Sequence, residues 1–234
     1  MILALVLLLQ ADFTDLFRAA YEERLRAGHP KIAESGVDLA LYVARRGDYA
    51  QAAPFLALVL ASPNPDATIL HNWAAAIERQ SPEQAERLYQ RALSIRKKTL
   101  PGGDVELATT RLNLAALLIA RGEYRGAEPL ARSALDAFER ANGAIGGRDG
   151  LACGALGAVR ATQGDVAGAE RYFRRALAIA EKVHGPRSEE TASALENLAD
   201  LLSQTGRESA ALPLLERAKR IRAIHANPVV REPQ

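Results

Sequence analysis

The feature that most constrains the fold is a motif that returns every 42 residues. A small residue stands at Ala85, Ala127, Ala169 and Ala211, and one further copy, Ala52, precedes Ala85 by 33 residues. A fixed period of about 20 to 50 residues is typical of solenoids, in which each unit buries its apolar face only by stacking on its neighbours. The chain is therefore expected to be an elongated stack of similar units.

Glycines mark the turn within most of these units. They stand five residues before four of the small positions, at Gly47, Gly122, Gly164 and Gly206. Each follows an apolar-periodic segment and precedes a polar one, which suits the left-handed conformation that ends a helix. The second unit has Ser81-Pro82-Glu83 instead, where proline suits the first helical position. Each unit is thus predicted to be a helix, a turn and a helix.

Two short motifs add a family resemblance to this pattern. Asn-Leu-Ala occurs at 113–115 and 197–199, and Ala-Glu followed by Arg-Ala-Leu occurs at 85–93 and 169–177. Together with the period, they resemble the kinesin light chain type of tetratricopeptide repeat, over about 33–226. The resemblance implies an all-α fold, a right-handed α-solenoid of helix-turn-helix repeats. It also implies that the first helices line a concave groove that binds another protein.

The breaks between the units give the domain organisation. Ser62 to Asp66, Pro101 to Asp104 and Gly185-Pro186 are rich in proline or glycine, which end helices. Residues 12–30 are interpreted as an N-terminal capping helix or partial repeat, 31–226 as the repeat domain and 227–234 as a C-terminal tail. The five repeats are expected at 31–62, 66–100, 105–142, 149–184 and 189–226.

The first eleven residues carry a separate signal. An apolar run, Ile2 to Leu9, is followed by Gln10 and Ala11 and then by the acidic Asp12. It resembles a short secretory signal peptide (1–11), which predicts export, to the periplasm in bacteria, and it is too short to span a bilayer. No Lys or Arg precedes the run, so the alternative is an ordinary buried helix of a cytoplasmic protein.

Composition agrees with a helical chain. Aromatic residues make up 5% and hydrophobic residues 48%, and the net charge is +2. The charge gives no strong field for nucleic acid, so no nucleic-acid partner is expected. The single Cys153 excludes an internal disulfide and is interpreted as a small packed residue, and Trp73 as a core residue.

No motif for catalysis, metal or cofactor stands out. The four histidines lack metal-ligand spacing, and the glycine-rich segment 143–150, predicted to be a loop, lacks the lysine and strand of a phosphate-binding loop. Arginines on the second helices have glutamate neighbours, which predicts a solvated, ion-paired face. The chain is predicted not to be an enzyme, with no metal and no cofactor.

The predicted binding surface is the groove lined by the first helices. Asn72, Asn113 and Asn197 share one repeat position, at which the fourth unit has Ala155. In the family that this chain resembles, such an amide bonds the backbone of a bound peptide; the alternative is that it caps or bridges helices. The candidate groove residues are Arg45, His71, Asn72, Arg79, Asn113, Glu196, Asn197 and Asp200, basic toward the N-terminus and acidic toward the C-terminus.

Two classes of function remain open at this point. The favoured one is a non-catalytic interaction module or scaffold that binds an unidentified protein or peptide in the groove. The alternative is a structural subunit that self-associates end to end through an uncapped last helix, whose apolar stripe holds Leu212, Leu215 and Ile221.

Overall fold

The computed structural model describes residues 65–141 and 147–226. The predictions for the signal-like segment, the N-terminal capping helix, the first repeat with Arg45 and Gly47, and the tail concern residues outside this part. The chain divides into two compact units, Met1–Ile95 and Arg96–Gln234, which are described separately. The boundary between them lies within one helix.

The described part of the first unit is a helix, a turn and a helix. α5 spans Ala67–Ile77, and α6 begins at Pro82 and ends at Thr99, beyond the unit boundary. Asp66 caps α5 because its Oδ1 accepts a hydrogen bond from the Thr68 backbone N–H at 2.6 Å. Trp73 is 3% exposed, which confirms it as a core residue. The prediction that Pro82 starts the second helix is also confirmed.

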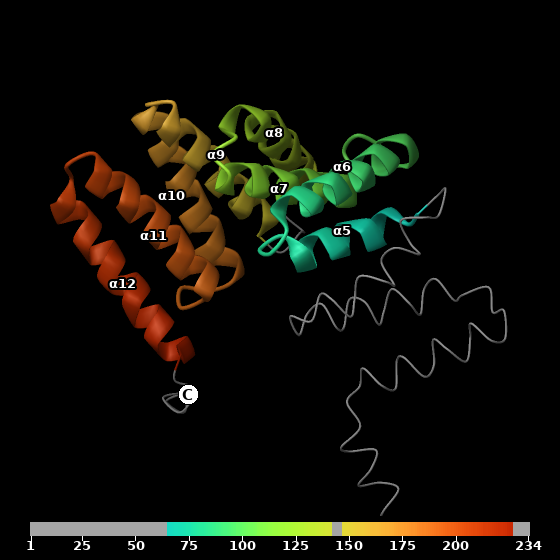
Figure 1. The fold of residues 1–234 in the computed structure, drawn as a ribbon. Helices are drawn as coiled ribbons and strands as arrows, with labels where there is room; N and C mark the ends of the chain where they lie inside the picture. The colour runs from blue at the N-terminus through green and yellow to red at the C-terminus, as the bar shows by residue number, and fades with distance from the viewer. Residues whose placement is uncertain (1–64, 142–146, 227–234) are drawn as a thin grey trace, which may run out of the picture. The chain divides into compact units, whose positions relative to one another are not determined.

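The second unit holds three further helix pairs. They are α7 (Val105–Ala120) with α8 (Tyr124–Arg140), α9 (Arg148–Thr162) with α10 (Val166–Val183), and α11 (Glu189–Gln204) with α12 (Glu208–Ala226). Figure 1 shows these helices following one another in chain order, and each packs on the next. The first helices also contact one another, α9 touching both α7 and α11. Every described element is helical, which confirms an all-α fold with pairwise packing, as in a solenoid.

Glycine turns join the two helices of each pair in the second unit. Gly122, Gly164 and Gly206 have φ values of 78°, 77° and 74°, as predicted for a left-handed helix end. The residue after each glycine donates its backbone N–H to a carbonyl five residues earlier, for example Glu123 to Leu118 at 2.8 Å. This bond satisfies a carbonyl that the ending helix leaves open.

Small residues let the two helices of a pair approach, and their partners vary in size to fill the space. Ala85, Ala127, Ala169 and Ala211 are all fully buried. In the α9–α10 pair, Gly157 faces Phe173 so closely that an added Cβ would lie 2.7 Å from the ring. At the equivalent positions the first helices have Ala115 and Ala199, and the second helices have Ala131 and Leu215, which are smaller than phenylalanine.

Two details differ from the sequence-based expectations. Residues 143–150 were expected to form a loop, but Arg148 to Gly150 are the first turn of α9, which follows a left-handed Gly147 (φ 79°). The second detail is that the apolar stripe expected on α12 is exposed only in part. Ile221 is buried with Ala192, Leu195 and Ala218, and Leu215 is half-buried, so only Leu212 of the three is exposed.

Candidate functional site

The exposed sides of α7, α9 and α11 form one surface, here called the first-helix face. Its residues are half-buried or exposed, stand at i, i+4 and i+7 on each helix, and recur every 42 residues. They are Thr109, Asn113 and Ala116 of α7, Leu151, Ala155 and Ala158 of α9, and Ser193, Asn197 and Asp200 of α11. Because the three helices contact one another, these stripes lie next to one another.

Two predicted amides lie on this face at equivalent positions. Asn113 on α7 is half-buried and Asn197 on α11 is exposed, with Ala155 of α9 between them in the repeat order. Sequence reasoning missed Leu151, whose side chain is 61% exposed on α9. The signal was present, because Leu151 occupies the position of Thr109 and Ser193, which are polar. The face thus combines two amides with an apolar, small-residue centre.

The predicted acidic end of the face is partly used within its own repeat. Glu196 accepts two hydrogen bonds from Arg222 of α12, at 2.9 and 2.8 Å, and Arg222 also donates to the Ser193 hydroxyl at 3.1 Å. These bonds with Arg222 hold the pKa of Glu196 below its usual value. Asp200 is exposed and makes no ion pair within 65–141 and 147–226. Its carboxylate is therefore accessible at this end of the face.

The other candidate residues belong to the first unit. His71 is half-buried, with its ring edge-on to Tyr89 at 5.4 Å, and the Tyr89 hydroxyl donates to Glu78 at 3.1 Å. Asn72 and Arg79 are exposed, and Arg45 lies outside the described residues. A groove that is basic at one end and acidic at the other joins residues of both units, and it stays a prediction.

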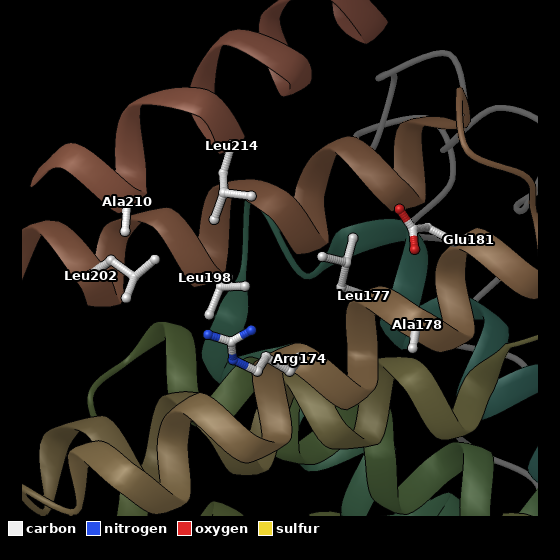
Figure 2. Close-up of a pocket in the computed structure, with 8 residues that line it drawn as sticks. All are labelled: Arg174, Leu177, Ala178, Glu181, Leu198, Leu202, Ala210 and Leu214. Carbon is white, nitrogen blue, oxygen red and sulfur yellow. The ribbon is translucent and has the colours of Figure 1, made fainter. Parts of the chain in front are cut away.

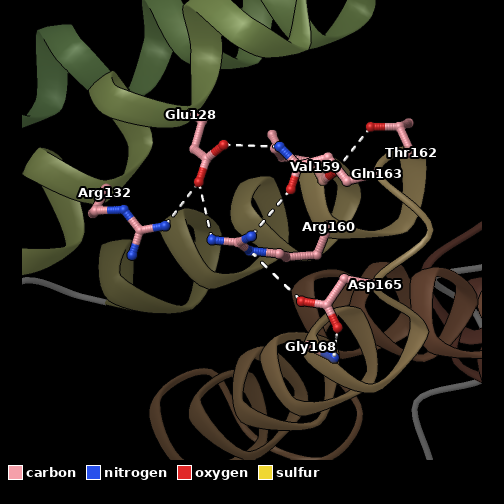
Figure 3. A network of polar contacts seen from close by, with 8 residues as sticks. All are labelled: Glu128, Arg132, Val159, Arg160, Thr162, Gln163, Asp165 and Gly168. Atoms are coloured by element: carbon pink, nitrogen blue, oxygen red, sulfur yellow. Dashed lines mark hydrogen bonds and ion pairs between the residues drawn. The ribbon is translucent and has the colours of Figure 1, made fainter.

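A polar network ties α8 to the next repeat (Figure 3). Glu128 accepts hydrogen bonds from Arg132 at 2.8 Å, from Arg160 at 3.0 Å and from Gln163 at 2.9 Å. Arg160 also lies 4.0 Å from Asp165, which caps α10 by accepting from the Gly168 N–H. The Gln163 and Arg132 hydrogen bonds hold the pKa of Glu128 below its usual range. Within this network only the Arg132–Glu128 pair lies on a second helix, since Arg160 and Gln163 belong to α9 and its C-terminal end.

The same kind of link recurs one repeat later. Glu170, 42 residues after Glu128, accepts from Arg174 at 2.7 Å and pairs with Arg207 at 2.9 Å. These two arginines lower the pKa of Glu170. A second link also repeats, since Arg175–Glu139 at 2.5 Å joins α10 to α8 and Arg217–Glu181 at 2.6 Å joins α12 to α10. Equivalent ion pairs therefore hold successive second helices together.

Side chains of α10, α11 and α12 line an open pocket of about 340 Å³ (Figure 2). Its lining is mostly apolar and comes from all three helices. The lining residues are Arg174, Leu177, Ala178, Glu181, Leu198, Leu202, Ala210 and Leu214. Figure 2 shows Arg174 and Glu181 projecting from α10 at either side of Leu177. This volume is at the small end of roughly 300–1,000 Å³ for sites that hold small ligands.

Few groups in this part of the chain suit covalent or metal chemistry. Cys153 is fully buried, which confirms it as a packed residue, and burial raises the pKa of its thiol to about 11. The described residues contain no group of three metal-ligating side chains. Within the same ranges, no helix has the length and apolar character needed to cross a membrane.

The comparison with family models decides what this stack of helices is. A model described as tetratricopeptide repeat matches residues 66–140 and 151–223. The chain belongs to the tetratricopeptide repeat family. Domains of this family are generally protein-interaction modules and are usually non-catalytic. No curated protein matches the chain by sequence.

Solved structures add the fold of related repeat proteins. BtubC from P. vanneervenii is 24% identical, with a TM-score of 0.73, and the match covers 94% of this chain and 92% of that chain. A putative kinesin light chain with nearly identical TPR-like repeats from Podosopora anserina is 20% identical, with a TM-score of 0.66 over 87% and 99% of the two chains. PilF of Pseudomonas aeruginosa is 19% identical, with a TM-score of 0.57 over 88% and 78%. At these identities the likeness concerns the fold alone.

Proposed function

We propose that this chain is a non-catalytic interaction module that binds a protein or peptide segment along its first-helix face. One observation carries the proposal: the tetratricopeptide repeats of the second unit place two amides, Asn113 and Asn197, at equivalent positions on one surface. An amide both donates and accepts hydrogen bonds, so it suits the backbone of an extended peptide of any sequence.

The centre of the face supports an apolar contact between these amides. Leu151 is exposed, and Ala155 and Ala158 beside it are small, so a bulky apolar side chain of the partner fits over α9. Asp200 on α11 adds a carboxylate without an ion-pair partner in the described ranges. The favoured ligand is therefore an extended segment with an apolar residue and a nearby basic residue.

A crosslinked pull-down from native extract tests this proposal. Three full-length baits are compared: the wild type, Asn113→Arg with Asn197→Arg, and the control Ser209→Arg, which adds positive charge to an exposed site on α12. The expected result is a protein that the wild type and the control recover and the double variant loses, with circular dichroism still helical. Recovery of the same proteins by all three baits would contradict a binding role for the first-helix face.

A structural subunit that self-associates end to end is the second candidate. It is favoured by Leu212, which is 56% exposed on α12 and occupies the repeat position of Glu86, Glu128 and Glu170. Sedimentation without a partner separates the two candidates. A mass that grows with protein concentration supports self-assembly, whereas a constant monomer mass supports the interaction module.

Export of the chain stays a proposal from the sequence of residues 1–11. It is tested by N-terminal sequencing of the protein recovered from its natural source. A chain that begins at or near Asp12 supports cleavage of a signal peptide, and an intact Met1 contradicts it.

A further inference from the structure

The pocket between α10 and α12 lies on the second-helix side of the second unit, away from the first-helix face. Its floor is formed by leucines of three helices, among them Leu198, Leu202 and Leu214. Both carboxylates near its rim are already neutralised, Glu170 by Arg174 and Arg207, and Glu181 by Arg217. A ligand therefore meets an apolar surface and no unpaired negative charge.

The repeat register shows what this chain places at the same positions one repeat earlier. Subtracting 42 from Leu202 and Leu214 gives Arg160 and Tyr172, which lie on α9 and α10. The Arg160 guanidinium reaches Glu128 of α8 at 3.0 Å, so it occupies the space beside α8 (Figure 3). Where the earlier repeat has a guanidinium and a phenol, the later one has two shorter apolar side chains and a pocket.

Arg132 and Arg174 occupy the same repeat position, so their surroundings can be compared directly. The pKa of Arg132 is raised by its hydrogen bond to Glu128 and, to a lesser degree, by the nearby phenol of Tyr172. Arg174, 42 residues later, has the same bond to a glutamate, but its phenol is replaced by Leu214. Its side chain is 65% exposed, compared with 45% for Arg132. Arg174 thus presents a positive charge at the pocket without the aromatic neighbour of its counterpart.

We propose that the α10–α12 pocket is a second binding site, which takes an aromatic side chain, tyrosine above all, from a protein partner. The ring would lie over Leu198, Leu202 and Leu214, in place of the Tyr172 ring of the preceding repeat. Its negative face is complementary in charge to the exposed guanidinium of Arg174, and a phenol oxygen can also accept a hydrogen bond from that group. An aliphatic side chain fills the floor but has no π face to place against the Arg174 guanidinium, which is paired with Glu170 and still 65% exposed.

The test is a titration of the full chain, labelled at leucine methyl groups, with N-acetyl-L-tyrosinamide. Saturable shifts are expected at Leu177, Leu198, Leu202 and Leu214, with a Kd on the order of 1 mM for so small a probe. N-acetyl-L-leucinamide should bind about two- to fivefold more weakly, because it lacks the interaction with Arg174. Equal binding of the two probes would overturn the aromatic specificity.

Two substitutions borrowed from the preceding repeat should close the pocket. Leu214→Tyr and Leu202→Arg each restore the residue that the chain carries 42 positions earlier, and either should abolish the saturable shifts while the circular dichroism spectrum is kept. The matched opposite change, Tyr172→Leu combined with Arg160→Leu, should create new probe-dependent shifts at Leu135 and Leu156. Unchanged binding of N-acetyl-L-tyrosinamide to both Leu214→Tyr and Leu202→Arg would overturn the proposal.

Two further outcomes distinguish this pocket from the first-helix face and from a contact between two copies of the chain. Asn113→Arg with Asn197→Arg should leave the probe titration unchanged, since those residues lie on the first-helix face. Shifts at the pocket leucines that depend on protein concentration rather than on the probe would identify a second copy as the occupant and would contradict a tyrosine-bearing partner.

Discussion

The α8–α10 and α10–α12 contacts share one backbone plan but end in different surfaces. Both are bridged by an ion pair at the same repeat positions, Arg175–Glu139 and Arg217–Glu181. Between α8 and α10 the chain adds its own polar network around Glu128, whereas between α10 and α12 it leaves an apolar pocket of about 340 Å³. Of the eight positions that line the pocket, four differ from the preceding repeat, and the largest changes are Arg160 to Leu202 and Tyr172 to Leu214.

This comparison separates what the repeat conserves along the chain from what each copy varies. The buried small residues and the turn glycines recur because close helix packing and left-handed helix ends favour them at those sites. The half-buried positions of the second helices have no such constraint, so each repeat can fill, link or open the space beside it. Binding surfaces in such a stack are therefore found by asking where one repeat departs from the next.

The largest loss of stability is expected at Phe173, an aromatic residue of α10, the helix that the two contacts share. Phe173 is 5% exposed, packs on Gly157 and belongs to the core shared with α11. Phe173→Ala should lower the free energy of unfolding by about 3–5 kcal/mol, because it removes a buried aromatic ring and leaves a cavity. Urea unfolding of the full chain, followed by circular dichroism, measures the loss.

The matched control for that experiment is Leu215→Ala. Leu215 occupies the Phe173 position in the last repeat but is only half-buried. Its truncation should cost about 1–2 kcal/mol, less than a fully buried leucine. Equal losses for the two variants would show that the α9–α10 pair is no better packed than the last pair.

A smaller loss is expected when the polar link of the α8–α10 contact is weakened. Glu128 accepts from Arg132, Arg160 and Gln163, and Glu128→Gln places an amide among these donors. The change should lower the unfolding free energy by about 1–2 kcal/mol. Glu170→Gln, which loses two arginine partners, should cost about 1 kcal/mol.

The exposed Glu216 on α12 provides the control for both substitutions, because it lies on the same kind of helix without a partner in the described ranges. Glu216→Gln should leave the urea midpoint unchanged within error. If Glu128→Gln is equally silent, the network of Figure 3 does not stabilise the α8–α10 contact.

Acid should weaken the ion pairs of Glu128 and Glu170, and the effect for each carboxylate should be small as long as the pH stays near neutral. The pKa values of Glu128 and Glu170 are lowered in the folded chain, chiefly by hydrogen bonds from Gln163 and Arg174 respectively. Such a group stabilises the fold above its unfolded pKa, about 4.3 for Glu, and the contribution is lost as the pH falls through the lower folded value. The melting temperature should fall as the pH is lowered from about 5 to about 2, and it should fall less steeply for Glu128→Gln than for the wild type. Equal slopes would exclude Glu128 as a source of this pH dependence.

The fold was predictable from the sequence because its determinants are local and periodic. Gly122, Gly164 and Gly206 each mark the end of a helix, and the small residues recur at a spacing that can be recognised in the sequence. The start of α9 was missed because Gly147 and Gly150 read alike in sequence, although only Gly147 adopts a left-handed conformation. Composition alone cannot distinguish a turn glycine from one packed against Ile179 in a helix.

The candidate surfaces were predictable only in part, since they depend on which distant residues meet. Asn113 and Asn197 were identified because they share a repeat position. The bond from Arg160 to Glu128 joins residues 32 apart, and the ion pair of Glu196 with Arg222 joins residues 26 apart, so neither follows from local pattern. The pocket was harder still, because Leu202 and Leu214 resemble ordinary core residues until their neighbours are known.

The smallest expected effect concerns the outer side of the last helix, where no later described repeat covers α12. Leu212→Glu restores the residue type of Glu86, Glu128 and Glu170, and it should change the unfolding free energy by less than about 0.5 kcal/mol, because the leucine is exposed.

The same variant tests end-to-end association. Burying one leucine gains about 1.5–3 kcal/mol, which is less than the roughly 4–15 kcal/mol that association costs. The exposed neighbours Glu216, Lys219 and Arg220 are charged and add little apolar area. Sedimentation at micromolar concentration should therefore give the same monomer mass for the wild type and Leu212→Glu. A wild-type dimer that Leu212→Glu dissociates would instead mean that α12 is completed by a second copy, and the self-assembling subunit would replace the interaction module as the better account of this chain.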